Sequence, residues 1–302
     1  LLNNDLRTAF RDERLSQQAG IARLKAQQID QWVAERAIDL GFLVNSLKGL
    51  PLGQIDAGPE PRQIAELVLY QVLIGHPERR EIMLFSSDGQ LLVEAGGVPG
   101  HSDHARLNDL VRDAARDGKL MVGPVRLDTG TPPRPSMAFA QPFDAGSAPA
   151  SRRFVVVLVV DPSVELFPKL QTWPSDSPTS EVVVVRRDGD DAVYLVAPRF
   201  WERPVPPSGL RLPLSTPGLM AAAAIRQGDG AREGVDYRGK KGLAASRAAT
   251  AVPWIVIAKS DYEEVMRPID RRSEKIVLVF GATILVAAFL VWSLWRRQQE
   301  EA

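Results

Sequence analysis

The sequence predicts an α+β fold with one long N-terminal helix, two similar modules built on antiparallel sheets, and one C-terminal transmembrane helix. Three observations predict this order. Residues 3–50 carry apolar side chains at near-helical spacing, a strand pattern that begins at Glu81 recurs at Glu181, and residues 276–295 contain no formal charge. The 302 residues are enough for about two domains of roughly 150 residues each.

The composition excludes several classes of function. Lys and Arg number 37, as do Asp and Glu, so the formal net charge is zero. We therefore expect no nucleic-acid partner, because binding to phosphates depends on a basic excess. The chain has no cysteine, which excludes disulfides, thiolate zinc sites, iron–sulfur clusters and cysteine nucleophiles.

The N-terminal segment 1–50 is predicted to form one long helix. Asn3, Asn4 and Asp5 are suitable N-cap residues, and the Leu-Pro step at Pro51 ends the segment. Glycines at positions 20 and 41 weaken the helix by about 1 kcal/mol each relative to alanine. Roughly 48 helical residues would be about 70 Å long, more than one module can cover. The helix should therefore run beside more than one module or pair with a second copy of the chain.

An internal repeat predicts the two modules. Residues 81–89 read EIMLFSSDG and residues 181–189 read EVVVVRRDG. Each copy is a strand followed by Asp-Gly and a second strand, which predicts a hairpin whose two turn residues take positive φ. Residues 154–161 and 254–261 match at the same offset, and each is a strand that ends at an aspartate before a helix. Each module therefore opens with a hairpin and closes with a long strand.

Other elements lie between the hairpin and the closing strand of each module. The sequence predicts helices at 61–73, 102–117 and 219–226, and strands at 121–127, 136–142, 210–214 and 240–247. The Pro- and Ser-rich stretch 172–180 separates the modules, and residues 198–209 and 228–234 are interpreted as loops. The expected boundaries of the two modules are therefore 51–165 and 166–262.

Residues 276–295 are predicted to cross a membrane. At 1.5 Å per residue, 20 uncharged residues span roughly 30 Å; basic residues flank them, and Trp292 and Trp295 lie near their C-terminal end. The alternative is a buried core helix, but such helices rarely lack a polar face. A count of basic residues would place the modules inside the cell, although an earlier helix usually dominates orientation. Because both ends look cut, we expect a piece of a larger membrane protein.

The order of elements resembles the double-Cache sensor domains of bacterial transmembrane receptors, which carry two PAS-like modules on a long helix. Local strings are similar to the branch found on sensor histidine kinases and diguanylate cyclases: residues 171–181 (QTWPSDSPTSE), 186–189 (RRDG), 236–239 (DYRG) and 253–259 (PWIVIAK). The resemblance implies a membrane-distal module at 51–165, a membrane-proximal module at 166–262, a juxtamembrane signalling helix at 263–275 and a cytoplasmic stub at 296–302. It places residues 1–275 in the periplasm or outside the cell, anchored in the inner membrane.

The resemblance also implies a small-molecule site in the distal module. Arg126 could bind a carboxylate through two hydrogen bonds, and Asp161 lies where amine-binding members of the family often have an acceptor for an ammonium group. Apolar walls would come from Tyr70, Phe85, Met137 and Phe139. The alternative is an exposed arginine, a capping aspartate before Pro162 and ordinary core aromatics. The family's amino-acid-binding pattern, an arginine closely followed by Trp-Tyr, is absent here, which argues against an amino-acid ligand.

No catalytic, metal or cofactor motif is complete. His101 and His104 could share a helical face but lack a third metal ligand. Ser102 lies in GHSDH, which ends in histidine where a nucleophile elbow has glycine. Residues 228–234 are one position off a dinucleotide fingerprint, and residues 188–191 lack the calcium-loop pattern. We therefore expect no metal, no cofactor and no enzymatic activity in this fragment.

Three functions remain open at this point. The first is an extracytoplasmic sensor that binds a small solute and passes a helix displacement to a histidine kinase or diguanylate cyclase output domain. The second is a ligand-free scaffold or partner-binding module, and the third is a membrane-anchored enzyme. The apolar stripe on residues 1–50 favours a homodimer, with the membrane as a further partner.

Overall fold

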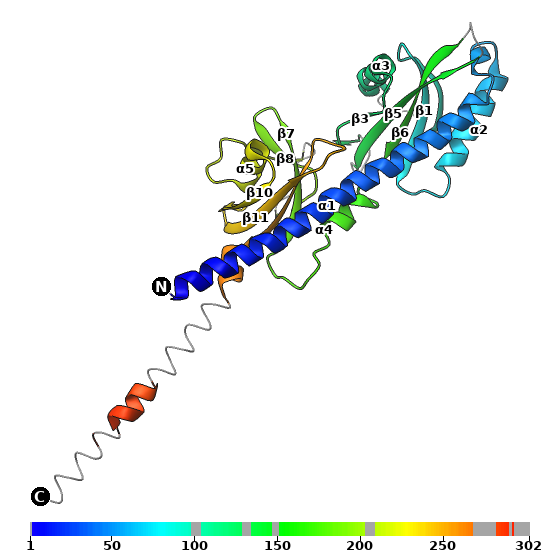
Figure 1. Cartoon of the computed structure of the whole chain (residues 1–302). Coiled ribbons are helices and arrows are strands. Elements are labelled where there is room, and N and C mark those ends of the chain that lie inside the picture. Colours follow the sequence, from blue (N-terminus) through cyan, green and yellow to red (C-terminus); the bar gives the residue numbers. More distant parts are fainter. Residues whose placement is uncertain are drawn as a thin grey trace, which may run out of the picture.

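Helix α1 (Leu2–Lys48) runs along two separate sheets, one in each module (Figure 1). The computed structural model describes residues 2–97, 104–128, 134–146, 151–202, 209–267, 282–289 and 292. Within these residues the chain is α+β, with both sheets antiparallel, as the sequence predicts.

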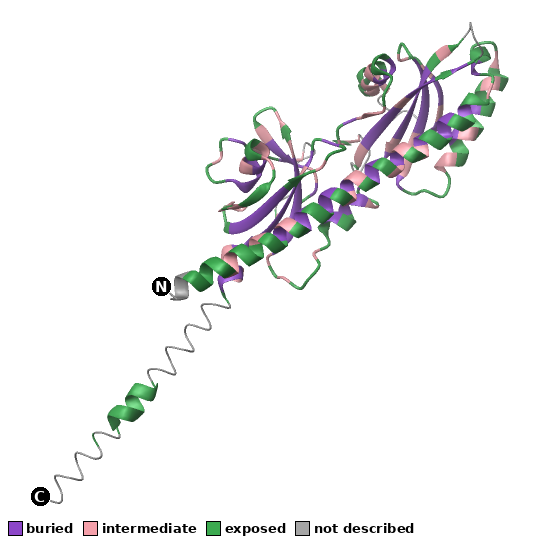
Figure 2. Ribbon diagram, viewed as in Figure 1, coloured by how far each residue is buried: buried purple, intermediate pink, exposed green. Residues whose placement is uncertain are grey.

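Helix α1 continues through both of its glycines without a break. Its buried stripe, which includes Ile29, Trp32 and Leu43, packs against both sheets, and this burial outweighs the low helix propensity of two glycines. The N-terminal part of α1 contacts the second module, where Gln18 meets Ser260, and its C-terminal part contacts the first, where Asp39 meets Arg79. Figure 2 shows the exposed face of α1 turned away from the buried sheets. The helix is therefore shared by the two modules.

The first module is a six-stranded sheet between two helical layers. Its strands are β1 (Arg79–Ser86), β2 (Leu91–Gly96), β3 (Met121–Val122), β4 (Arg126–Leu127), β5 (Pro135–Ala145) and β6 (Arg152–Val160). The order is β2-β1-β6-β5-β3, and β4 also pairs with β5. Helices α1 and α2 (Pro59–Leu73) cover one face, and α3 (Asn108–Asp117) covers the other. Short 3₁₀ turns occupy Leu52–Gln54 and His104–Leu107.

The second module repeats this plan. Its strands are β7 (Glu181–Asp188), β8 (Asp191–Tyr194), β9 (Leu210–Pro213), β10 (Gly230–Val235), β11 (Lys241–Ala248) and β12 (Ile255–Asp261). The order β10-β11-β12-β7-β8-β9 has the same connectivity as the first sheet, with β9 added at the edge. Helix α4 (Leu166–Gln171) lies before it in the chain, and α5 (Met220–Gln227) packs on the face away from α1.

Several local predictions need correction. Strand β10 covers residues that were interpreted as a loop. Its two glycines lack the side chains that would show a strand pattern, and pairing with β11 stabilises the strand. The strand expected at 121–127 is two short strands, β3 and β4. In the β7–β8 hairpin Asp188 pairs with Asp191, so the turn residues are Gly189 and Asp190. Among the described residues only glycines have positive φ, so the aspartate of Asp-Gly does not adopt it.

The predicted membrane span lies mostly outside the described residues. Residues 262–267 and 282–289 are helical, whereas 268–281 and 293–302 are not described. In the part of the chain that the structure covers, no helix combines the length and the apolar character needed to cross a bilayer. The span at 276–295 and the stub at 296–302 therefore stay predictions.

Candidate functional site

The six residues predicted to form a distal site lie on different sides of the first sheet. Met137 and Phe139 are fully buried on the α1 face, where the Trp32 ring meets the Phe139 ring edge-on at 5.8 Å. Phe85 is buried on the opposite face, beneath α3. Tyr70 is half exposed on α2. The four apolar residues therefore do not form the walls of a single cavity.

The two polar residues of the predicted site lie at one end of the sheet. Arg126 on β4 pairs with Ser136 on β5. Met137, the next residue of β5, pairs with Val160 on β6, and Asp161 follows directly. Arg126 is exposed, whereas Asp161 is buried and accepts hydrogen bonds from the Ser163 amide at 2.9 Å and its hydroxyl at 2.5 Å. Asp161 therefore caps a turn, and a ligand role for either residue stays a prediction.

The α3 face of the first sheet is packed with apolar side chains. Its buried cluster consists of Met83, Phe85, Val111, Ala114, Ala115, Ala138, Ala140, Val155 and Val157. These residues hold α3 against the sheet through the hydrophobic effect. The buried part of this face is therefore apolar.

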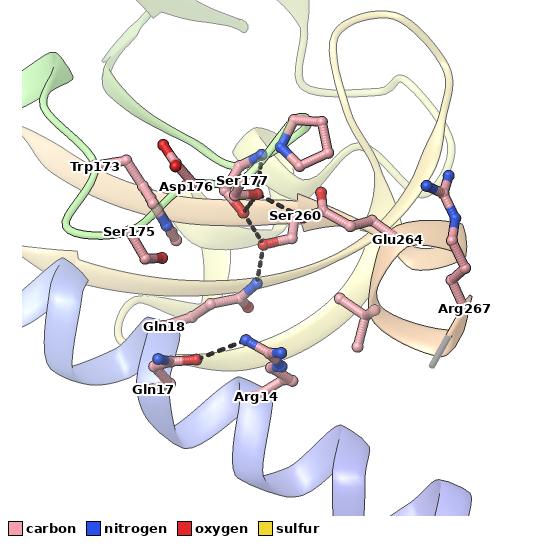
Figure 3. Close-up of a pocket in the computed structure, with 13 residues that line it drawn as sticks. Arg14, Gln17, Gln18, Trp173, Ser175, Asp176, Ser177, Ser260, Glu264 and Arg267 are labelled. Atoms are coloured by element: carbon pink, nitrogen blue, oxygen red, sulfur yellow. Dashed lines mark hydrogen bonds between the residues drawn. The ribbon is translucent and has the colours of Figure 1, made fainter. Parts of the chain in front are cut away.

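A chain of hydroxyl hydrogen bonds connects three parts of the fold at the second module. Gln18 of α1 donates to Ser260 of β12 at 2.9 Å, and Ser260 is 2.6 Å from Ser180, at the end of the segment that joins the modules (Figure 3). The Ser177 hydroxyl donates to Glu264 on helix 262–267 at 2.7 Å, and its oxygen lies 2.5 Å from the Ser180 hydroxyl. We call this chain the polar relay. It ties α1, the connecting segment and the C-terminal helix together.

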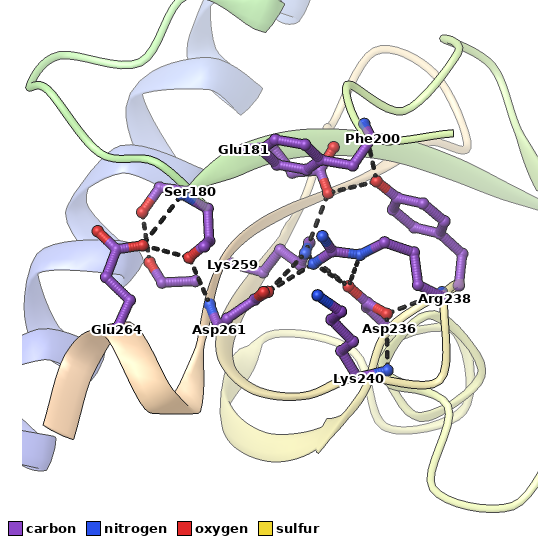
Figure 4. Close-up of polar contacts among 12 residues, drawn as sticks. Ser180, Glu181, Phe200, Asp236, Arg238, Lys240, Lys259, Asp261 and Glu264 are labelled. Atoms are coloured by element: carbon purple, nitrogen blue, oxygen red, sulfur yellow. Dashed lines mark hydrogen bonds and ion pairs between the residues drawn. The ribbon is translucent and has the colours of Figure 1, made fainter. Parts of the chain in front are cut away.

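A buried charged cluster lies on the other face of the second sheet, the face that carries α5 (Figure 4). The ammonium of Lys259 is 2.7 Å from Asp236, 3.0 Å from Glu181 and 3.3 Å from Asp261. The Lys259 side chain is only 2% exposed. Three acceptors match the three donors of an ammonium group, which satisfies the hydrogen-bonding needs of the buried charge.

The guanidinium of Arg238 completes the charged cluster. It contacts Asp236 at 2.6 Å and Asp261 at 2.5 Å, and it lies over the Phe200 ring at 4.9 Å. The hydroxyl of Tyr237 donates to Glu181 at 2.7 Å and accepts from the amide of Phe200 at 3.2 Å. The cluster therefore joins β7, β12, the β10–β11 turn and the loop at Phe200.

Electrostatics within the charged cluster favour the ionised state. Burial opposes ionisation of Asp236, but hydrogen bonds from Lys259 and Arg238 outweigh it and hold the pKa of Asp236 below its ordinary value. Burial and the hydrogen bond to Glu181 raise the pKa of Tyr237, so the phenol stays protonated. Three carboxylates face two cations, and each carboxylate has a partner in the cluster. Such an arrangement holds segments together and has no group left to act as a general acid or base.

The acid dependence of stability tests the charged cluster. Because folding lowers the pKa of Asp236, its contribution to the free energy of unfolding is present above its unfolded pKa and lost as the pH falls below about 4. The Asp236→Asn variant should therefore lose stability less steeply than the parent chain between about pH 5 and 3. Urea denaturation at a series of pH values measures this slope.

The exposed Asp117→Asn substitution on α3 is the control, and it should leave the slope of the parent chain unchanged. An Asp236→Asn slope as steep as that of the parent chain would contradict the ionised form of the cluster.

The charged cluster was not predicted, although two sequence signals point to it. The internal repeat puts Asp261 at the position of Asp161, so the same reasoning applied to the second copy identifies Asp261. Lys259 interrupts an apolar strand at a position that alternates with buried Ile257. The DYRG string supplies Asp236 and Arg238, but no sequence pattern shows that its turn lies beside Lys259.

Comparison with known proteins identifies the fold. No protein-family profile and no curated protein matches the chain. The ligand-binding domain of the Campylobacter jejuni chemoreceptor Tlp3, solved with L-valine, matches with a TM-score of 0.60 at 12% identity, over 86% of this chain and 97% of that one. The extracellular domain of the histidine kinase rpHK1S-Z16 matches with a TM-score of 0.58 at 16% identity, over 84% and 97%.

A third solved structure agrees with these two. The ligand-binding domain of the Pseudomonas aeruginosa PAO1 amino-acid chemoreceptor PctC, in complex with GABA, matches with a TM-score of 0.55 at 18% identity, over 82% of this chain and 100% of that one. The chain thus has the fold of the ligand-binding sensory domains of chemoreceptors and histidine kinases, in agreement with its resemblance to double-Cache domains.

Proposed function

We propose that this chain is the ligand-sensing region of a bacterial transmembrane signalling receptor, which binds a small solute in the distal module at 51–165. The observation that carries the proposal is the match over nearly the whole of solved sensory domains. A site on the distal module has support from the position of Arg126, whose exposed side chain makes no ion pair within the described residues. A free guanidinium can hold an anionic group of the solute in two hydrogen bonds.

Transmission through the membrane rests on two helices that lie close together. Strand β12 runs directly into helix 262–267, and the polar relay joins that helix to α1. A solute that binds more tightly when α1 is in one position would favour that position, and helix 262–267 would move with α1. The solute can shift this equilibrium only by the difference between its affinities for the two states. The displacement would pass along 263–275 and the span at 276–295 to a histidine kinase or diguanylate cyclase beyond the stub at 296–302. Residues 1–275 then lie outside the inner membrane.

The exposed face of α1 supports a homodimer. Leu6, Leu24 and Phe42 are each at least half exposed and are separated by 18 residues, which is five helical turns, and Ile38 lies beside them. Apolar side chains exposed on one face of a helix can pack against a second copy of the chain. Two copies of the chain would cover this face with α1 against α1.

A ligand screen on the whole chain in detergent tests the proposal. Organic acids, amines, sugars, nucleobases and metal ions are added separately, and the unfolding midpoint is measured. A solute at 100 times its dissociation constant adds about 2.7 kcal/mol to stability, so we expect one class to raise the midpoint by a few degrees. We expect Arg126→Ala and Asp161→Asn to abolish that shift. The matched control is Arg116→Ala, an exposed arginine of the same module that pairs with Asp113 and Asp117 on α3.

Two other outcomes would redirect the proposal. A shift that survives both substitutions would move the site away from Arg126 and Asp161. The absence of a shift with any solute would favour a ligand-free scaffold, the second candidate, for which the apolar packing beneath α3 is the supporting observation.

A further inference from the structure

A cavity of about 390 Å³ lies where α1, the segment that connects the modules and helix 262–267 meet (Figure 3). It is on the α1 side of the second module and so is separate from the proposed distal site. Its walls include Arg14, Gln18, Trp173, Asp176, Glu264 and Arg267. We call it the junction cavity. Its volume is within the range of about 300–1,000 Å³ that small-molecule sites occupy.

Gln18 gives the junction cavity an unused hydrogen-bond acceptor. Its side chain is buried, with only 3% of the residue exposed, and its Nε2 donates to Ser260. Its Oε1 is enclosed and has no partner among the described residues. A buried acceptor without a donor costs free energy, and a hydroxyl group of a ligand in the cavity would supply that donor.

Two arginines, Arg14 and Arg267, line the junction cavity together with two carboxylates, Asp176 and Glu264. Arg14 contacts Gln17 at 3.1 Å and lies over the Phe10 ring at 5.2 Å, and neither it nor Arg267 pairs with a carboxylate in the described part of the chain. Glu264 at the same end is already occupied, since it accepts hydrogen bonds from Ser177 and Thr179. An arginine free of carboxylates is suited to bind the carboxylate of a ligand.

The opposite end of the junction cavity combines an aromatic ring with polar groups. Figure 3 shows Trp173, Ser175 and Asp176 together on the connecting segment, away from Glu264 and Arg267. The Trp173 ring can cover the C–H face of a sugar ring, while the Ser175 hydroxyl can donate or accept, and the Asp176 carboxylate can accept, hydrogen bonds with the sugar hydroxyls.

We propose that the junction cavity binds a sugar acid, with its carboxylate at Arg14, one hydroxyl on Gln18 Oε1 and its ring against Trp173. The bound sugar acid contacts α1 and the connecting segment, in a cavity whose third wall is helix 262–267. It would therefore shift the same equilibrium between positions of α1 and helix 262–267 as the distal solute. This regulatory effect rests on the proposed function, whereas the binding of the sugar acid does not.

Isothermal titration of the whole chain in detergent tests the junction cavity with three probes. These are D-galacturonate, D-galactose, which lacks the carboxylate, and succinate, which lacks the ring hydroxyls. We expect D-galacturonate to bind at least tenfold more tightly than either of the others, because each omits one set of contacts. D-Galactose or succinate binding as tightly as D-galacturonate would overturn the assignment, as would no heat of binding from D-galacturonate.

Variants locate the site and separate it from the distal one. Arg14→Ala and Gln18→Leu should each weaken D-galacturonate binding about tenfold or more. Arg23→Ala, an exposed arginine on the same helix, and Arg126→Ala should leave it unchanged. Because Arg14 is exposed, its substitution leaves folding intact even where Gln18→Leu does not. Unchanged binding in Arg14→Ala would overturn the junction site, and a loss in Arg126→Ala would assign the sugar acid to the distal module.

Discussion

Replacing Lys259 with methionine is expected to lower the free energy of unfolding by about 3–5 kcal/mol at pH 7. The substitution keeps an unbranched side chain of similar length but removes the charge that faces Glu181, Asp236 and Asp261. Two of these carboxylates are almost fully buried, and without the ammonium group they repel one another in a medium of low dielectric constant. Urea denaturation of the parent chain and the variant measures the difference.

Two controls make the Lys259 result specific. Lys241→Met removes an exposed lysine of the same module and should change stability by less than about 1 kcal/mol. The Lys259→Met deficit should also shrink as the pH falls toward 4, because protonated carboxyl groups no longer repel. A deficit below about 1 kcal/mol, or one that is independent of pH, would mean that the cluster does not hold the second module together.

Replacing Trp32 with alanine is expected to cost about 3–5 kcal/mol of stability. The Trp32 side chain is almost fully buried, packs edge-on against Phe139 and donates to Glu165 at 3.2 Å. The guanidinium of Arg36 lies over its ring at 5.0 Å. The substitution therefore opens a cavity at the place where α1 passes from the second module to the first. Thermal and urea denaturation measure the loss.

At position 32, the stability that comes from the size of the side chain can be measured separately from the stability that comes from its hydrogen bond. Trp32→Phe keeps most of the ring packing and should cost less than half as much as Trp32→Ala, since it loses mainly the bond to Glu165. Gln31→Ala, at the exposed neighbouring position, should change stability by less than about 0.5 kcal/mol. Equal losses in Trp32→Ala and Gln31→Ala would show that this contact does not fasten the helix to the first module.

The architecture could be predicted from the sequence because its signals are local and repeated. The helical periodicity of 3–50 and the hairpins at Glu81 and Glu181 each lie within one stretch of chain, and the repeat assigns both modules the same order of strands. Strand β10 was missed because glycine carries no side-chain pattern and the pairing partner, β11, decides its conformation.

The candidate sites were harder to predict because they depend on contacts between distant residues. Gln18 meets Ser260 across 242 positions, and Trp32 meets Glu165 across 133. Alternation along a strand tells which residues share a face, but not which face is packed by a helix. This is why Phe85 and Phe139, both correctly expected in strands, lie on opposite sides of the first sheet.

The shared helix has a consequence for the modularity of such proteins. One continuous apolar core contains Leu43 of α1, Phe139 of the first module and Trp254 of the second. A gene fusion with its crossover between the modules would place a foreign second module against α1. The buried apolar face of this α1 is complementary to the original module and not to the foreign one. Chimaeras that exchange recognition should therefore stay folded only when α1 and both sheets come from one parent, and laboratory recombination between homologues should yield functional crossovers beyond Asp261 rather than within 165–180.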